Sequence, residues 1–455
     1  MKRGSFSTRL GFILAASGSA VGLGNIWKFP FEVSNGGGAA FLIMYLMFCF
    51  ILCFPVIVSE IAIGRKTKKN AIGAFNEMGK REWNFIGKMG VLCGVLILSF
   101  YTIVAGWVLG YVVEMIKGNF SISDNFGGYV NNINNVLFYS VLFMFITAFI
   151  VSKGVEKGIE KAAKILMPSL ILIILLLIVY ALTLPNSIEG IIFYLVPDFS
   201  QINLTVAGNA LGQAFFSLSL GMGMLITYGS YINKDNNIIN SAALITLTDV
   251  GIAFLAGLII FPFVFSSGIE TEGGPGLIFQ VFPKIFEGLG PLTGTLVGST
   301  FFILLSFAAI TSTVSLLEVP VSYLVDEYKI ERKYSVWIVA IIILLIGVPS
   351  ALSQGKTVFF SEFITYFGND KPIDFMQFII DVSNDTLLPF GGFLITMYVS
   401  FIWKKRNLSD EISIGNPKYK GSLMEKYINF SITYVCPLIL GSIFLLTFLN
   451  KFFGI

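Results

Sequence analysis

The sequence predicts an all-α polytopic membrane protein with eleven transmembrane helices. Hydrophobic residues make up 55% of its 455 residues and charged residues only 13%, and the mean hydropathy is +0.82. This apolar content exceeds what the core of a soluble domain needs. The apolar residues also form runs of about 20 residues, the length at which a helix crosses the hydrocarbon layer. Residues 1–455 are therefore predicted to form a single transmembrane domain.

Each apolar run is assigned to one spanning helix, in chain order. The first five runs cover residues 10–33, 39–63, 90–116, 136–152 and 165–184. The next five cover 206–231, 241–266, 296–322, 334–352 and 375–403, and an eleventh covers 428–449. The first run follows nine residues rich in polar and basic side chains and lacks a small-residue cleavage site, so it is expected to be a resident helix rather than a signal peptide.

Positive charge orients the predicted bundle, because cytoplasmic loops retain lysine and arginine. With the N-terminus inside, 24 of the 30 lysines and arginines fall in cytoplasmic segments. We therefore expect a multi-pass protein of the cell (inner) membrane with a cytoplasmic N-terminus and an extracellular C-terminus. The net charge of +3 reflects this bias and gives no sign of a nucleic-acid partner.

The residue types that are missing argue against an enzyme. The chain has no histidine, which removes the commonest general base and zinc ligand. Its four cysteines, at 49, 53, 93 and 436, fall inside or at the ends of spans and form no paired motif, so they are read as small apolar residues. The sequence predicts no organic cofactor.

Two predicted spans carry clusters of small residues where a regular helix should continue. The first is GSAVGLGN at 18–25, and the second is GQAFFSLSLGMG at 212–223 in the sixth span. Glycine costs a helix interior about 1 kcal/mol relative to alanine. Because an odd number of spans separates the two starts, the two interrupted helices run antiparallel.

This pattern indicates an inverted repeat of residues 10–184 against residues 206–403, with residues 428–449 outside it. Small residues can also mark close helix packing, which is the reading for the isolated Gly106 and Gly110. Two opposed clusters instead favour discontinuous helices that meet near the membrane midplane. Unwound carbonyls there can coordinate a cation, and helix N-termini can hold a carboxylate.

These segments resemble the neurotransmitter:sodium symporters, whose bacterial amino-acid transporters share the LeuT-like fold. The resemblance rests on RLGFILAASGSAVGLGNIWKFP followed by NGGGAAFLIMY, and it recurs at SLSLGMGMLITYGSY, AAITSTVSLLEVP and LLPFGG. It covers nearly the whole chain, although the twelfth helix usual in the family is missing.

The resemblance implies two sodium sites made only of oxygen ligands, which suit a hard cation. One site would use the carbonyl of Ala20 and the side chains of Asn25, Ser217 and Asp249. The other would use the carbonyls of Gly18, Val21 and Ala308 and the hydroxyls of Thr311 and Ser312.

Asp249 departs from the pattern of many family members, which carry a neutral asparagine there and need chloride to supply negative charge. A carboxylate in the middle of a span is costly and is expected to be functional. Here it would replace the anion, so transport is expected not to require chloride.

The resemblance also implies a substrate pocket for a small neutral amino acid. Tyr101 matches the tyrosine whose hydroxyl reaches the substrate carboxylate. Ser19 stands where monoamine transporters place an aspartate, so the substrate must bring its own carboxylate. The remaining positions implied to line the pocket are Ala20, Gly22, Phe216, Ser217, Ser219, Gly221, Met222 and Leu316. Gly221 and Gly223 flank the adaptable Met222, which favours a large hydrophobic or aromatic side chain.

Charged pairs are implied to gate this pocket on both sides. Lys28 and Asp381 match the outer pair, with lysine in place of the usual arginine and hence without its bidentate fork. Asp381 is preferred to Asp374 and Asp385 because of its distance from LLPFGG. The inner set comprises Arg3, Asp326, Ser230 and Tyr231. Glu60 matches the acid that binds freed backbone groups of the broken sixth helix, and Glu318 is a further intramembrane acid expected to have a partner inside the bundle.

The predicted function is sodium-coupled import of a neutral, hydrophobic or aromatic L-amino acid by alternating access. Two alternatives remain open: a transporter of the same fold driven by protons or by exchange, and a membrane sensor that binds an amino acid without transport. The expected partners are the lipid bilayer and the amino acid, and the protein is expected to be a monomer or a weak dimer.

Overall fold

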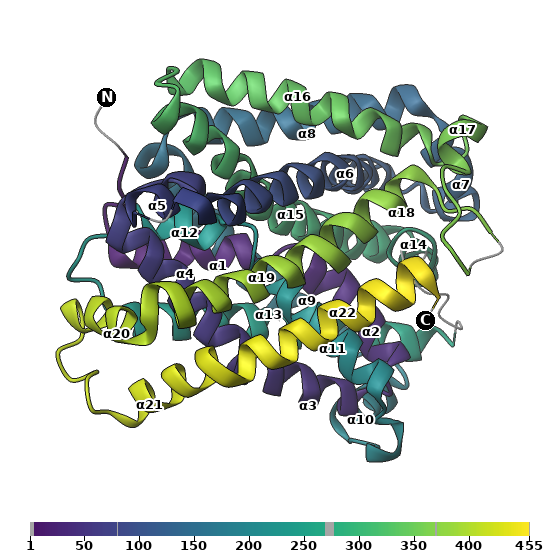
Figure 1. Cartoon of the computed structure of the whole chain (residues 1–455). Coiled ribbons are helices and arrows are strands. Elements are labelled where there is room, and N and C mark those ends of the chain that lie inside the picture. The colour runs from purple at the N-terminus through teal and green to yellow at the C-terminus, as the bar shows by residue number, and fades with distance from the viewer. Residues whose placement is uncertain (1–3, 80, 269–276, 369–370, 455) are drawn as a thin grey trace.

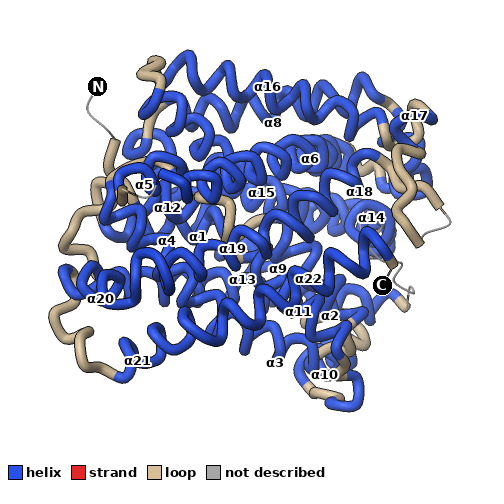
Figure 2. Tube along the Cα trace, in the orientation of Figure 1, coloured by secondary structure: helices blue, strands red, loops and turns tan. Residues whose placement is uncertain are grey.

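The computed structural model describes residues 4–79, 81–268, 277–368 and 371–454. Within this part the chain is a bundle of helices, and no strand forms beyond one antiparallel bridge between Ile364 and Ile373. The all-α prediction is confirmed. The loops gather at the two ends of the bundle, apart from short breaks inside it (Figure 2).

Residues 9–181 contain the first group of helices, with short π- or 3₁₀-helical segments labelled η. They are α1 (Arg9–Ala20), η1 (Gly24–Lys28), α2 (Phe29–Asn35), α3 (Ala39–Phe48), η2 (Cys49–Cys53), α4 (Phe54–Thr67), α5 (Ala71–Glu77), η3 (Arg81–Trp83), α6 (Asn84–Ile116), η4 (Phe120–Asn125), α7 (Phe126–Asn131), α8 (Ile133–Ser152), η5 (Val155–Glu160) and α9 (Lys161–Ala181).

The second group begins after α9. It comprises α10 (Ser187–Leu195), η6 (Phe199–Gln201), α11 (Leu204–Ser217), α12 (Met224–Gly229), α13 (Ile238–Ser267), η7 (Leu277–Val281), α14 (Phe282–Gly288), α15 (Pro291–Glu327), α16 (Arg332–Leu352), α17 (Val358–Ser361), α18 (Phe375–Ile380), η8 (Asp381–Leu387), α19 (Leu388–Met397), η9 (Tyr398–Lys404), α20 (Lys405–Ile414), α21 (Leu423–Phe430), η10 (Ser431–Val435) and α22 (Cys436–Phe453).

In the described part, nine helices are long and apolar enough to cross a membrane, and the bent pair of α1 with η1–α2 would make ten. The predicted count of eleven also needs α11 and α12 to form one span, although residues 218–223 separate them. That count, and the division into repeats 10–184 and 206–403, stay predictions.

The first break lies between α1 and η1. Thr8 caps the start of α1 by accepting the Gly11 N–H, and the helix ends at Ala20 because Val21 is extended (φ −70°, ψ 110°). The chain then bends by 53° into η1 and α2. The break exposes the last carbonyls of α1 to the centre of the bundle.

The second break lies between α11 and α12. Ser219, Gly221 and Gly223 all adopt positive φ, at 54°, 80° and 73°. Glycine has this conformation without steric cost, whereas Ser219 is held there by its surroundings. A Cβ on Gly221 would lie 2.6 Å from the Leu388 carbonyl oxygen, so glycine also lets the break pack directly on the α19 backbone.

Both breaks are enclosed by long helices. α15 packs along α6 and contacts α1, α9 and α12, while α13 contacts α1 and η1. The N-terminal residues lie at one end of the bundle with α5, α20 and α21, and the C-terminus lies at the other end with α2, α14 and α17 (Figure 1). The packing therefore leaves freed backbone from the two breaks inside the protein, where it can form a site.

Candidate functional site

A buried carboxylate connects the two breaks. Asp249 of α13 has no exposed surface. Its Oδ2 accepts a hydrogen bond from the Ser217 hydroxyl at 2.7 Å, and its Oδ1 accepts one from the Asn25 amide at 2.7 Å. The Tyr45 hydroxyl, from α3, lies 3.4 Å from Asp249 Oδ2 and 3.2 Å from Ser217 Oγ. Asn25 lies just after the first break, and Ser217 is the last residue of α11. The hydrogen bonds of Asp249 therefore connect both broken helices.

The other predicted ion ligands meet on the opposite side of the first break. Thr311 Oγ1 donates to the Ala308 carbonyl at 2.9 Å and lies 3.4 Å from the Val21 carbonyl. A Cβ on Gly18 would lie 3.1 Å from Thr311 Cβ, so the glycine permits this close approach of α1 to α15. Ser312 follows on the same turn of α15 and is also buried.

Tyr101 of α6 lies beside the unwound residues. Its hydroxyl accepts a hydrogen bond from the Leu23 N–H at 2.9 Å. A Cβ on Gly22 would lie 2.9 Å from the Tyr101 hydroxyl and 3.2 Å from Ser312 Oγ. Tyr101 is therefore positioned at the unwound backbone, where the neighbouring Gly22 N–H donates to Asn25 Oδ1 at 3.0 Å.

The remaining predicted substrate residues fall into two sets. Ser219 donates to the Ser19 carbonyl at 3.3 Å, and the Ser19 hydroxyl pairs with that of Ser315. Met222 and Leu316 are buried, with 3% and 4% of their surface exposed. The lining of the large cavity described next includes Tyr101 and Phe216. It does not include Ser19, Ser219, Met222 or Leu316.

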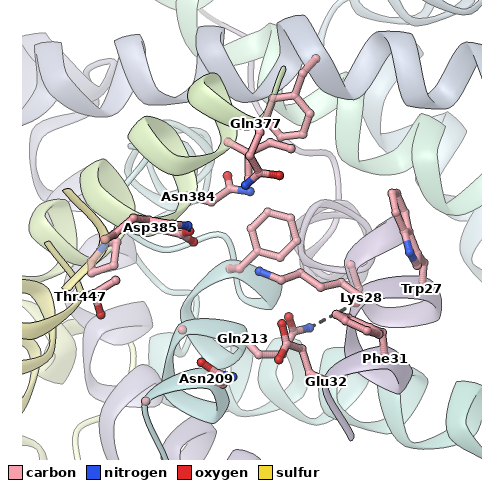
Figure 3. A pocket seen from close by; sticks show the side chains of 18 of the residues that line it. Trp27, Lys28, Phe31, Glu32, Asn209, Gln213, Gln377, Asn384, Asp385 and Thr447 are labelled. Atoms are coloured by element: carbon pink, nitrogen blue, oxygen red, sulfur yellow. Dashed lines mark hydrogen bonds and ion pairs between the residues drawn. The ribbon is translucent and has the colours of Figure 1, made fainter. Parts of the chain in front are cut away.

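A cavity of about 960 Å³ extends from Tyr101 and Phe216 towards the end of the bundle that holds the C-terminus. Its lining comes mainly from η1, α2, α6, α11, α18, η8 and α22 and includes five charged side chains: Lys28, Glu32, Asp374, Asp385 and Lys451. Lys28 reaches into its centre, and Asn384 and Asp385 lie on the facing wall (Figure 3). Its lining combines apolar and charged side chains, which suits a zwitterion with an apolar side chain.

The structure does not bring Lys28 and Asp381, the predicted outer pair, together. Lys28 Nζ lies 4.8 Å from the centre of the Phe216 ring. The Asp381 carboxylate contacts Lys451 Nζ and Gln377 Nε2, each at 2.7 Å, and accepts from the Tyr366 hydroxyl at 3.1 Å.

Tyr366 belongs to the loop before α18. Burial, reinforced by the nearby negative charge of Asp381, raises the pKa of Tyr366, so its hydroxyl stays protonated and able to donate. The Asp381 carboxylate is therefore held by its own neighbours in the conformation described.

The predicted inner set lies at the opposite end of the bundle. Arg3 lies outside the described residues. Asn70 donates to Asp326 at 3.3 Å, and Ser230 and Tyr231 follow directly after α12. The Tyr231 hydroxyl donates to Glu318 at 2.7 Å.

Glu318 is the intramembrane acid that was expected to have a partner inside the bundle, although the sequence did not identify it. The structure pairs it with Arg332, whose guanidinium contacts both carboxylate oxygens, one of them at 3.1 Å. Arg332 also donates to the Val151 carbonyl at 2.9 Å. Glu60, in turn, accepts the Gly221 N–H at 2.9 Å and so satisfies one freed donor of the second break.

Comparison with known proteins agrees with this geometry. The sodium:neurotransmitter symporter family matches residues 3–132 and 122–452. The chain belongs to this family. It is accordingly a sodium-dependent multi-pass membrane transporter and not an enzyme.

Relatives of the symporter align with most of its length. An uncharacterized sodium-dependent transporter of Bacillus subtilis, YhdH, is 36% identical over 97% of this chain and 96% of its own. The human sodium- and chloride-dependent GABA transporter 2 is 26% identical and covers 79% of this chain and 69% of its own. The crystal structure of MhsT in complex with L-phenylalanine is 40% identical, with a TM-score of 0.88 over 98% of this chain and 99% of that chain. The last match confirms the expected LeuT-like helical fold.

Several residues at the symporter's site were not predicted from its sequence. Tyr45, Ser315 and Lys451 lie in apolar segments where nothing in the spacing distinguishes them from packing residues. Arg332 offered a signal, because a lone intramembrane acid such as Glu318 needs a cation and Arg332 opens the next span.

Proposed function

We propose that this symporter imports a neutral, hydrophobic or aromatic L-amino acid together with sodium, by alternating access and without chloride. The observation that carries the proposal is the buried Asp249. Its partners within the described part of the chain, Asn25, Ser217 and Tyr45, carry no positive charge. Because an uncompensated carboxylate in the membrane interior is costly, the site favours a bound cation.

The surrounding oxygens suit sodium as a transported ion. The site offers a carboxylate, hydroxyls and the carbonyls freed at the ends of α1 and α11, which are ligands for a hard cation. A second ion would lie at Val21 and Thr311. Two sodium ions crossing about 100 mV would release about 4.6 kcal/mol, at roughly 2.3 kcal/mol per charge.

The substrate proposal rests on Tyr101 and Phe216. The Tyr101 hydroxyl and the unwound backbone at Gly22 and Leu23 would hold the substrate carboxylate, and the Phe216 ring in the cavity wall would contact its side chain. MhsT, which shares the fold, was crystallised with L-phenylalanine. Competition by the twenty amino acids in a sodium-dependent binding assay tests this choice. A preference for lysine, glutamate or a monoamine would contradict it.

Uptake into proteoliposomes separates the proposal from its alternatives. Replacing sodium by choline at fixed pH should abolish uptake, whereas a proton-driven transporter would continue. Replacing chloride by gluconate should have no effect on the native protein. Asp249→Asn should weaken sodium dependence or make uptake chloride-sensitive, and full uptake by this variant in sodium gluconate would refute the role of Asp249. Binding without any uptake would indicate a sensor.

A further inference from the structure

A lysine from the last helix joins the charges of the cavity. Asp381 and Asp385 lie four residues apart on η8, and the Lys451 ammonium of α22 contacts both carboxylates, Asp381 Oδ1 at 2.7 Å. α22 (Cys436–Phe453) overlaps the predicted eleventh span, 428–449, which lies outside both predicted repeats. A helix with no counterpart in the repeats therefore supplies a cation to the cavity wall.

The two aspartates differ in how firmly they are held. The Asp381 side chain is 1% exposed and is satisfied by Lys451, Gln377 and Tyr366. The Asp385 side chain is 28% exposed, lines the cavity and is paired with Lys451. Breaking a buried pair is costly, but an exposed pair is worth little and exchanges readily. Asp385 is thus the acid that can change partners.

Lys28 is the cation placed to take it. Lys28 and Asp385 project into the same cavity from facing walls (Figure 3). Lys28 Nζ lies 4.8 Å from the centre of the Phe216 ring, a weak cation–ring contact that Lys28 can exchange for a carboxylate. Lys451 and Lys28 can compete for one carboxylate.

We propose that Lys451 is a positioning residue of the gate at this end: it holds Asp385 on its own wall and keeps the cavity open. Asp385, rather than Asp381, is then the acid that Lys28 meets when the cavity closes. The inference rests on the proposed alternating access.

Cysteine labelling of the cavity tests the competition without needing transport. Val104 lines the cavity and is largely buried, and the four native cysteines are buried, so Val104→Cys reports opening to a membrane-impermeant thiol reagent. With substrate and sodium absent, adding Lys451→Met should slow labelling by about threefold to fivefold, the range of an exposed ion pair. Lys451→Arg should retain the native rate.

The deciding variant combines Lys451→Met with Asp385→Asn. It should restore the native labelling rate, because residue 385 then carries no charge for Lys28 to draw across the cavity. A structural role for Lys451 alone would not be reversed in this way. Lys451→Met also removes a partner of the buried Asp381. The series is therefore repeated in an Asp381→Asn background, where this second effect is absent.

Lys117→Met serves as the matched control, since Lys117 pairs with Glu114 outside the cavity lining. It should leave labelling unchanged. Native labelling in Lys451→Met, or slowing that persists after Asp385→Asn, would overturn the proposal. Labelling responds as described even if the amino acid or the coupling ion proves different, so failure of the proposed function is scored separately by uptake.

Discussion

Ion pairs at the two ends of the bundle differ in how deeply their charged side chains are buried. At the end that holds the N-terminal residues, the charged side chains Glu318 and Arg65 have no exposed surface and are paired, with Arg332 and with Glu411 at 2.8 Å. At the cavity end, partly exposed charged groups line a space of about 960 Å³. The Glu318 and Arg65 pairs at the first end are buried, whereas the Lys451–Asp385 pair at the second is partly exposed.

Residues 6–8 also pack at this first end. The Phe6 ring lies 5.5–6.2 Å from the rings of Phe12, Tyr228 and Tyr231. Glu160 of η5 accepts hydrogen bonds from the Ser7 N–H and hydroxyl, each at 2.7 Å, and from the Thr8 hydroxyl at 3.0 Å. Removing one partner of a buried pair costs about 3–5 kcal/mol, whereas an exposed pair is worth about 0–1 kcal/mol. The comparison teaches that separating the buried pairs costs more free energy than separating the exposed ones, so the cavity end is expected to rearrange more readily.

The largest expected effect is at Arg332. Arg332→Met leaves the buried Glu318 without its cation and should destabilise the protein by about 3–5 kcal/mol. The measurement is the apparent unfolding temperature of the purified protein in detergent. The double variant with Glu318→Gln is the control and should recover more than half of the loss. An unchanged unfolding temperature in Arg332→Met would remove the energetic basis of the comparison.

A smaller effect is expected where η5 holds the N-terminal segment. Glu160→Ala removes the acceptor of three hydrogen bonds from Ser7 and Thr8 and should loosen this segment by about 1–3 kcal/mol. Backbone hydrogen exchange over residues 7–12 should become at least about fivefold faster, since 1.4 kcal/mol corresponds to tenfold. Glu156→Ala, an exposed acid on the same segment, should leave exchange unchanged. Equal protection in both variants would show that packing of Phe6 suffices.

At the cavity end, Lys28→Met should have little effect on stability. It removes a cation–ring contact with Phe216 worth about 0.5–1 kcal/mol. The unfolding temperature should therefore fall far less than in Arg332→Met. A fall of similar size would mean that Lys28 has a buried ionic partner and that the cavity end is not the readily rearranged one.

The smallest effect is expected at Lys284, which pairs with Asp124 at 3.0 Å where both side chains are exposed. Lys284→Met should change stability by less than about 1 kcal/mol, and added salt should reduce even that difference. Unfolding in low and high salt measures it. A large, salt-independent loss would contradict the assignment of this pair to the exposed class.

The two breaks show how far sequence reasoning reached. Both were located from clustered small residues, but the glycines serve different purposes. At the second break Gly221 and Gly223 supply positive φ. At the first, the break is the extended Val21, while Gly18 and Gly22 make room for Thr311 and for Tyr101. Spacing signals a break in either case, but only the packed neighbours distinguish conformational freedom from close approach.

The charged residues show where that reasoning stopped. Asp249 was identified from its position in the middle of a span, and the structure adds Tyr45 to its predicted neighbours Asn25 and Ser217. The proposed outer gate depends instead on which acid faces Lys28. Sequence distance favoured Asp381, whereas the fold buries Asp381 against Lys451 and leaves Asp385 at the cavity.

The sequence by itself determined that the chain is helical, that two helices break, and that it belongs among sodium symporters, because hydropathy, helix-breaking residues and motifs are local properties read along the chain. Only the tertiary structure decided which charges are paired and how deeply each pair is buried. Glu318 with Arg332 and Asp385 with Lys451 join residues from different helices. Burial, which sets the energy of such pairs, exists only once those helices have packed.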